Sequence, residues 1–314
     1  MNILLIYYTG TYNTRYLSCR AEEALAARGH TVTRVEIRRG TPVADTQGFD
    51  LIGFGYPIYG FNSPLPFNRY VKKLNIARGQ KFFIYKNSGE TFAVNNASSR
   101  ILLRRMHKKG AIFAGEYHFV MPYNIHFAYD RPFVREILEK DEKLMRIMIH
   151  RLETGSAPKI QSNFWYNVAS AAVSVQKIGG TVNSFFYRAD MHKCVQCMRC
   201  VRDCPENNIR FEKGKIRFGH RCDMCMRCSF FCPTDAIKIG FLQGWKVNGD
   251  YRLAEIANDP LPEKPYIDES SRGFFKCFIR TFREIDEQYA ALFPAQNKDV
   301  KSAETDEHGG QNTQ

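Results

Sequence analysis

Runs of apolar residues alternate with amphipathic stretches along the amino-terminal half of the chain. The apolar runs predict five strands, at 2–7, 31–37, 51–55, 81–86 and 111–121. The amphipathic stretches predict helices near 14–28, 64–74, 96–109 and 132–154. This alternation predicts an α/β fold with a doubly wound parallel sheet of five strands and helices on both of its faces.

The remainder of the chain is less regular. Residues 156–187 are predicted to form a helical connector, because polar residues such as Asn167 and Ser170 interrupt the apolar stretch 164–178. That stretch falls short of the roughly 20 apolar residues that cross a membrane, so we expect a packing or docking helix and no membrane span. Residues 188–244 are rich in cysteine. Beyond them, 245–314 form an extension with a helix expected at 273–293 and a polar tail, from 296, expected to be disordered.

Eight of the ten cysteines follow one spacing twice, and a proline comes after each run. The runs are Cys194-x2-Cys197-x2-Cys200-x3-Cys204 and Cys222-x2-Cys225-x2-Cys228-x3-Cys232. Three cysteines at steps of three wrap a tight turn, so that their sulfurs converge on three corners of one cubane cluster. Zinc and disulfides are the alternatives, although a closed zinc site uses two separated pairs and leaves the third cysteine without a role. Cys19 and Cys277 lie outside the repeat, and neither is a predicted ligand.

The repeat is similar to that of bacterial-type two-cluster ferredoxins, small α+β domains in which the fourth cysteine of each run ligates the cluster of the other run. The resemblance implies one 4Fe-4S cluster held by Cys194, Cys197, Cys200 and Cys232. It implies a second 4Fe-4S cluster held by Cys222, Cys225, Cys228 and Cys204.

The turn after the first predicted strand has the features of a phosphate site. The start of the following helix carries hydroxyl and amide side chains, and the helix dipole and unpaired N–H groups favour an anion there. The residues concerned are Thr9, Thr11, Tyr12, Asn13 and Thr14. A capped helix start is the alternative. The turn resembles the phosphate loop of flavodoxins, with Tyr12 where glycine is usual, and this resemblance implies a flavodoxin-like fold that binds FMN.

In a flavodoxin-like fold the ligand lies beyond the carboxyl ends of the strands, so two further loops should meet it. These loops contribute Pro57, Ile58, Tyr59 and Gly60 after the third strand, and Asn87, Ser88 and Gly89 after the fourth. We expect Tyr56, Tyr59 or Phe61 to stack on the flavin ring, while core packing accounts for at least one of the three. Residues 121–124, after the fifth strand, are a further candidate loop.

Over residues 1–240 the chain resembles a bacterial and archaeal family in which a flavodoxin-like domain is fused to a two-cluster ferredoxin domain. The resemblance implies FMN beside two 4Fe-4S clusters in one electron-transfer protein. We therefore expect a flavodoxin-like FMN-binding domain at 1–155, a connector at 156–187, a ferredoxin domain at 188–244 and an extension at 245–314.

The formal net charge of +13 changes this picture little. Clusters and a flavin phosphate would offset much of it, so we expect no nucleic acid partner. Within 188–238, basic residues outnumber acidic ones, which favours acidic redox partner proteins. The sequence begins without a basic leader or a cleavage site, and its cysteines suit a reducing compartment, so we expect a cytoplasmic protein.

Three functions are compatible with these motifs. The first is an electron carrier between soluble partners. The second is a flavin-dependent oxidoreductase that acts on a small substrate, with the clusters as its input and His118, His126 or Tyr123 as a proton source. The third is a redox-sensing module without flavin, an alternative that Tyr12 leaves open. The sequence contains no Gly-x-Gly-x-x-Gly fingerprint of nicotinamide binding.

Overall fold

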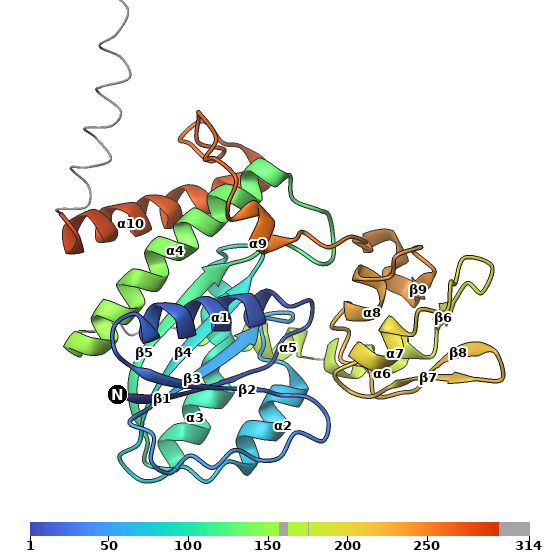
Figure 1. Cartoon of the computed structure of the whole chain (residues 1–314), viewed down its shortest axis with the longest axis horizontal. Helices are drawn as coiled ribbons and strands as arrows, with labels where there is room; N and C mark the ends of the chain where they lie inside the picture. Colours follow the sequence, from blue (N-terminus) through green and yellow to red (C-terminus); the bar gives the residue numbers. More distant parts are fainter. Residues whose placement is uncertain (157–162, 175, 295–314) are drawn as a thin grey trace, which may run out of the picture.

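A five-stranded parallel sheet forms the centre of the amino-terminal half (Figure 1). The structure is a computed structural model and describes residues 1–156, 163–174 and 176–294. The strands are β1 (Asn2–Tyr7), β2 (Thr31–Glu36), β3 (Leu51–Pro57), β4 (Lys81–Ser88) and β5 (Ile112–Val120). Their order, β2-β1-β3-β4-β5, is that of the flavodoxin-like doubly wound fold. The five predicted strands and the α/β fold class are therefore confirmed.

Helices cover both faces of the sheet. On one face lie α1 (Asn13–Ala26) and α4 (Arg131–Thr154), and on the other lie α2 (Leu65–Lys73) and α3 (Arg100–Lys108), the last preceded by the 3-10 helix η1 (Ala93–Ser99). Successive residues of a strand face opposite sides of a sheet. In β1, Ile3 and Leu5 accordingly pack in the core beneath α1 and α4, whereas Leu4 and Ile6 pack in the core beneath α2 and α3.

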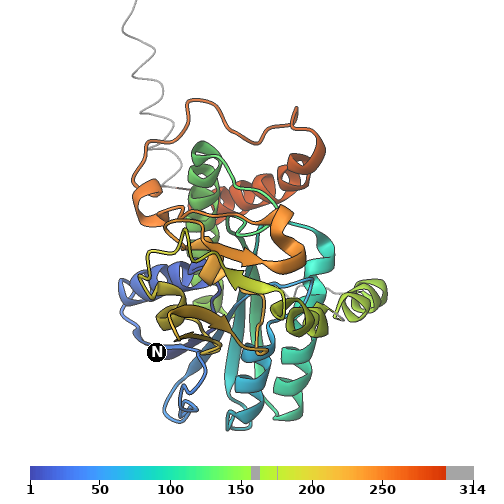
Figure 2. The same ribbon diagram turned by 90° about the vertical axis from the view of Figure 1, so that its right-hand side faces the viewer.

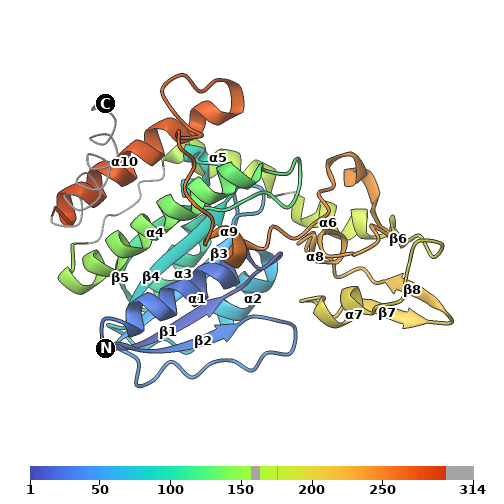
Figure 3. The same ribbon diagram turned by 45° about the horizontal axis from the view of Figure 1, so that its top comes forward.

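The carboxyl-terminal segment returns to the sheet domain. Its helix α10 (Lys276–Leu292) follows the 3-10 helix η3 (Gly273–Phe275) and lies along α4, as Figure 3 shows. Phe278 and Phe282 of α10 are buried in the core beneath α4, together with Ile256 of the short helix α9 (Leu253–Ile256). The expected helix at 273–293 is thus present, and this part of the predicted extension completes the first domain. The predicted tail, from 296, lies outside the described residues.

The connector contains two helices where one was expected, α5 (Phe164–Val173) and α6 (Gln176–Ser184). The Ser170 hydroxyl of α5 donates to the carbonyl of Phe61 at 3.0 Å and contacts the Asn62 amide oxygen at 3.1 Å, so α5 is fixed beside the loop after β3. No helix in the described ranges is both long enough and apolar enough to cross a bilayer.

The cysteine-rich segment forms a small α+β unit. It contains β6 (Tyr187–Ala189), α7 (Arg199–Asp203), β7 (Ile209–Glu212), β8 (Lys215–Phe218), α8 (Arg227–Phe230) and β9 (Ile237–Ile239), followed by the 3-10 helix η2 (Gly240–Trp245). β6 pairs with β9 and β7 with β8, both antiparallel. Figures 1 and 2 show this unit beyond the carboxyl ends of the parallel strands.

The packing of α10 predicts that the first domain depends on the carboxyl-terminal segment. Phe278→Ala should lower the free energy of unfolding by about 3–5 kcal/mol, because the Phe278 side chain is 0% exposed and its removal leaves a cavity. Phe164→Ala, at a side chain that is 70% exposed, should change it by less than about 0.5 kcal/mol. Urea unfolding of the full chain measures both. Equal small effects would contradict the placement of α10.

Candidate functional site

The two cysteine runs share an unusual backbone as well as a spacing. Non-glycine residues adopt left-handed conformations at equivalent positions of the two runs: Gln196 (φ 53°), Met198 (φ 58°) and Asn207 (φ 47°) in the first, and Met224 (φ 50°), Met226 (φ 61°) and Asp235 (φ 51°) in the second. Each such residue costs roughly 1–2 kcal/mol. A short helix then begins at the same position of each run, at Arg199 and at Arg227. The sequence repeat is therefore a structural repeat.

Backbone N–H groups approach the sulfurs in the same repeating manner. The N–H of Asn208 donates to Cys204 Sγ at 3.3 Å, and the N–H of Ala236 donates to Cys232 Sγ at 3.2 Å. The fourth cysteine of each run thus accepts from a backbone N–H, and in the second run Cys222 Sγ also accepts, from the N–H of Met224 at 3.4 Å. Such donors favour the thiolate form of cysteine, which is the form that binds metals.

The sulfurs gather in two neighbouring groups. Cys194, Cys197, Cys200 and Cys232 line one small cavity, which Cys204 and Cys228 also border. Burial, together with the neighbouring Cys194, Cys197 and Cys232, raises the pKa of Cys200 to about 11. Burial likewise raises the pKa of Cys228 well above its ordinary value, and Cys225, Cys222, Cys204 and Cys200 also raise it. Cys232 thus lies near Cys200 of the first run, and Cys204 lies near Cys228 of the second.

Among the described residues, no three His, Cys, Asp or Glu side chains are arranged to hold a single metal ion.

A cavity of about 580 Å³ opens at the carboxyl ends of the strands. This volume is within the ordinary range for sites that hold a small molecule or cofactor. Of the residues predicted for the flavin, all but Tyr12 and the ring candidate Tyr56 line it: Thr9, Thr11, Asn13, Thr14, Pro57, Ile58, Tyr59, Gly60, Phe61, Asn87, Ser88 and Gly89. Residues 121–124 line it as well.

The β1–α1 loop (residues 8–12) has the features of an anion site. The Thr9 hydroxyl is buried and has no hydrogen-bond partner among the described residues. No side chain caps the amino terminus of α1, so its first N–H groups are available to an anion. Thr14 donates to the Asn87 amide oxygen at 2.7 Å, and Asn13 donates to the Pro122 carbonyl at 2.9 Å. The loops are therefore tied together around a cradle that fits a phosphate.

Tyr12, which stands where the resemblance to a flavodoxin phosphate loop would place glycine, has a left-handed backbone. Its φ is 69°, a left-handed conformation that glycine adopts without strain. The tyrosine ring lies outside the cavity lining, with its centroid 4.4 Å from the Arg227 guanidinium carbon and 5.1 Å from the Phe231 ring centroid. The Tyr12 ring is thus held outside the cavity lining.

Of the three aromatic residues expected to stack on the flavin, one lies in the core and two line the cavity. Tyr56 is fully buried and packs on Phe67, with ring centroids 4.8 Å apart, so it is the ring that core packing accounts for. Tyr59 and Phe61 line the cavity. A side chain on Gly89 would overlap the Tyr123 ring, so glycine is required where the loop after β4 meets the loop after β5.

A carboxylate that the sequence did not single out lies at the cavity. Glu90, which is 8% exposed, accepts from the Tyr123 hydroxyl at 2.5 Å and from the Asn95 amide at 3.0 Å. Burial, with Glu90 beside it, raises the pKa of Tyr123, which therefore keeps its proton. His126 also lines the cavity, whereas His118 lies behind Ser88, with Nε2 2.7 Å from its hydroxyl, and does not.

The far wall of the cavity comes from later parts of the chain. It is formed by Gly179, Gly180 and Asn183 of α6, by Cys222, Asp223, Met224 and Met226 of the second cysteine run, and by Phe241, Leu242 and Trp245 of η2. Neither spacing nor periodicity indicates these contacts, because they depend on how the small unit docks. The cavity is therefore shared between the sheet domain and the cysteine-rich unit.

Solved flavodoxins are similar to the amino-terminal half of the chain. A flavodoxin from Archaea covers 49% of this chain and 99% of its own, with 11% identity and a TM-score of 0.36. Flavodoxin 2 from Bacillus cereus covers the same shares with 16% identity and a TM-score of 0.38. General stress protein 14 from Treponema denticola, solved in complex with FMN, also covers 49% and 99%, with 14% identity and a TM-score of 0.37. No family model and no curated protein sequence matches. The strand order itself defines the class of this half as flavodoxin-like.

Close packing at the loop predicts that Gly10 tolerates no side chain. A Cβ at Gly10 would overlap the Tyr59 hydroxyl and lie 2.9 Å from the Cys225 carbonyl oxygen. Gly10→Ala should therefore destabilise the full chain by about 1–3 kcal/mol. Gly244→Ala, where a Cβ meets open space, should be close to neutral. Thermal and guanidinium unfolding of the two variants provide the comparison, and a neutral Gly10→Ala would count against the contact between loop and cysteine run.

Proposed function

We propose that this chain is an electron-transfer protein that binds one FMN in the shared cavity and two 4Fe-4S clusters on the cysteine repeat, and that it exchanges electrons with redox partner proteins. The observation that carries the proposal is the shared wall. Cys222, Asp223 and Met224 line the same cavity as Thr9 and Asn87, so with both cofactors bound a cluster ligand would border the flavin.

Different residues of the cavity would hold the phosphate and the ring of FMN. The Thr9 hydroxyl and the first N–H groups of α1 would bind the phosphate, and Tyr59, Phe61 and Tyr123 would flank the ring. Bound there, FMN would supply a store for one or two electrons and the clusters would supply one-electron centres. Burial raises the pKa of the Cys225 and Cys228 thiols, so without a metal they keep their protons. The positive charge of iron would be needed to bring them to the thiolate form.

The two cysteine groups differ in their surroundings, which suggests the order of the centres in the relay. Cys222 of the second group borders the cavity, whereas Cys197 of the first group is exposed and Val195 beside it is 62% exposed. We therefore assign the first group to the partner surface and the second to the flavin. Lys193 and Arg202, both exposed, give that surface a basic character that would attract an acidic partner. Cluster thiolates require a reducing setting, so we place the protein in the cytoplasm.

A flavin-dependent oxidoreductase is the second candidate, and the Glu90–Tyr123 pair favours it. The pair presents a hydroxyl and a carboxylate inside the cavity, where they could hold a proton near a substrate. Substrate-dependent reoxidation of the flavin, lost in Tyr123→Phe, would support this function. The absence of FMN from oxygen-free preparations would instead leave the redox-sensing module.

The cofactor content tests the proposal as a whole. The full chain, purified without oxygen, should contain about eight irons, about eight sulfides and about one FMN. Zinc in place of iron, or protein without inorganic sulfide, would overturn the assignment of clusters. Protein with iron and sulfide but without FMN would overturn the flavin half alone.

Paired substitutions test which cysteines act together. Cys204→Ser/Cys225→Ser changes two members of one group, so the variant should keep about four irons. Cys197→Ser/Cys204→Ser, which replaces the same number of cysteines, changes one member of each group and should lose nearly all iron. Iron and sulfide analysis under nitrogen distinguishes the two. The reverse result would mean that each run holds its own cluster.

A further inference from the structure

We infer that Arg227 positions the β1–α1 loop for the phosphate of the flavin, so that the second cysteine run directly supports flavin binding. The inference rests on the proposed function, since it takes FMN as the ligand of the cavity. It concerns one side chain that lies between two cluster ligands, Cys225 and Cys228, and reaches into the other domain.

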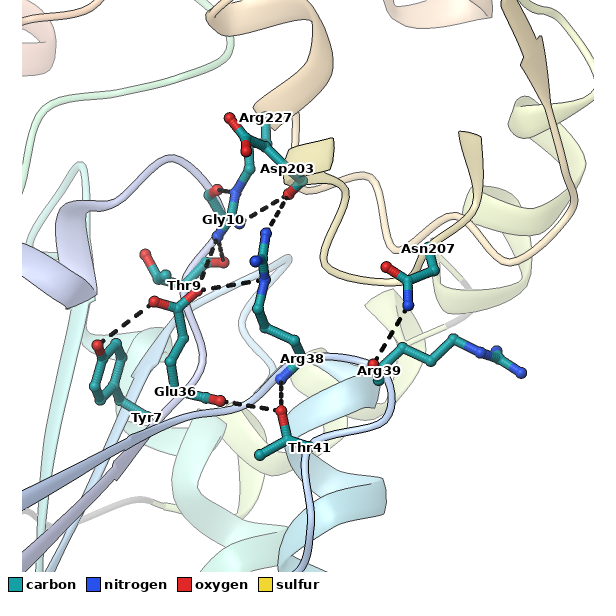
Figure 4. A network of polar contacts seen from close by, with 10 residues as sticks. All are labelled: Tyr7, Thr9, Gly10, Glu36, Arg38, Arg39, Thr41, Asp203, Asn207 and Arg227. Atoms are coloured by element: carbon teal, nitrogen blue, oxygen red, sulfur yellow. Dashed lines mark hydrogen bonds and ion pairs between the residues drawn. The ribbon is translucent and has the colours of Figure 1, made fainter. Parts of the chain in front are cut away.

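Arg227 is 2% exposed and uses its guanidinium as a three-way clamp (Figure 4). Nε donates to the Gly10 carbonyl at 2.5 Å, and Nη2 donates to the Thr9 carbonyl at 2.7 Å. Nη1 donates to the carbonyl of Asp203, at the end of α7, at 2.9 Å. The planar guanidinium thus fixes two successive carbonyls of the loop relative to the cysteine-rich unit.

The orientation of those carbonyls determines where the loop N–H groups point. In a trans peptide the C=O and N–H bonds point in opposite directions. Because the carbonyls of Thr9 and Gly10 face Arg227, the N–H groups of Gly10 and Thr11 face away from it. Thr9, Gly10 and Thr11 line the cavity, whereas Arg227 does not. Arg227 therefore directs two backbone donors of the loop toward the cavity.

The surroundings of Arg227 hold it in this position. The Tyr12 ring lies against the guanidinium, and Glu36 Oε1 is 3.7 Å from Nη2. A second arginine strengthens the junction, since Arg38 donates to the same Asp203 carbonyl at 3.0 Å (Figure 4). The guanidinium stays protonated at all physiological pH values, so it also adds a fixed positive charge behind the anion cradle.

The internal repeat supplies a matched control. Arg199 occupies the position in the first run that Arg227 occupies in the second, one residue before the third cysteine. Its guanidinium carbon lies 4.5 Å from the Phe231 ring centroid, and its Nε lies 3.6 Å from Asp203. These contacts stay within the cysteine-rich unit. Substitution of Arg199 therefore perturbs a cysteine run without removing a hydrogen bond to the loop.

The test compares FMN with riboflavin, which lacks the phosphate. Arg227→Gln and Arg199→Gln are made in the full chain, purified without oxygen, freed of flavin and titrated with each compound by flavin fluorescence. In Arg227→Gln the preference for FMN over riboflavin should fall about tenfold or more, the size expected when charge-assisted hydrogen bonds are lost. In Arg199→Gln the preference should stay within about twofold of the unchanged chain.

The outcomes separate the inference from the function on which it rests. An unchanged chain that binds neither flavin overturns the proposed function. An unchanged chain that prefers FMN, together with an Arg227→Gln variant that keeps the same preference, overturns the inference alone. If Arg227→Gln does not fold, Arg227→Lys is read in the same way, because it retains the charge but loses the three-way clamp. A reduced preference then supports the inference, and an unchanged preference overturns it.

Discussion

The buried guanidinium of Arg227 joins the two parts of this molecule. It belongs to the second cysteine run, yet two of its hydrogen bonds end on the β1–α1 loop of the sheet domain. A buried charge is costly unless it is fully paired, and breaking one partnership costs several kcal/mol. The loop, the end of α7 and Glu36 must therefore keep their relative positions, and the cavity between the domains is defined by that constraint.

Because of this constraint, both the sheet domain and the cysteine-rich unit contribute walls to the cavity. The sheet supplies a rigid edge, and hydrogen bonds such as those of Asn13 and Thr14 tie its loops to one another. The opposite wall belongs to Asp223 and Met224, which are far away in sequence. A ligand in this cavity would contact both parts at once. That is the physical basis for proposing one relay and not two independent cofactor domains.

Much of the sheet domain could be predicted from the sequence, because the central strands β1 and β3 are continuous apolar runs that a sheet covered on both faces buries. The loops of the cavity followed from the fold, since the carboxyl ends of parallel strands meet at one edge. The left-handed conformation of Tyr12 has no local signal, because it depends on packing against Arg227 and Phe231. The far wall of the cavity depends on how the cysteine-rich unit docks against the sheet domain. The burial of Phe278 in the core of the sheet domain depends on how α10 docks. Hydrophobic periodicity encodes neither arrangement.

Anomalous X-ray diffraction at the iron edge, on crystals grown without oxygen, tests the central claim most directly. The account predicts two compact groups of iron sites, the second bounded by Cys204, Cys222, Cys225 and Cys228. It also predicts density for a flavin in the adjoining cavity, with its phosphate at the β1–α1 loop. Isolated single-metal peaks with a zinc edge, or a flavin bound away from the second cysteine run, would contradict the account.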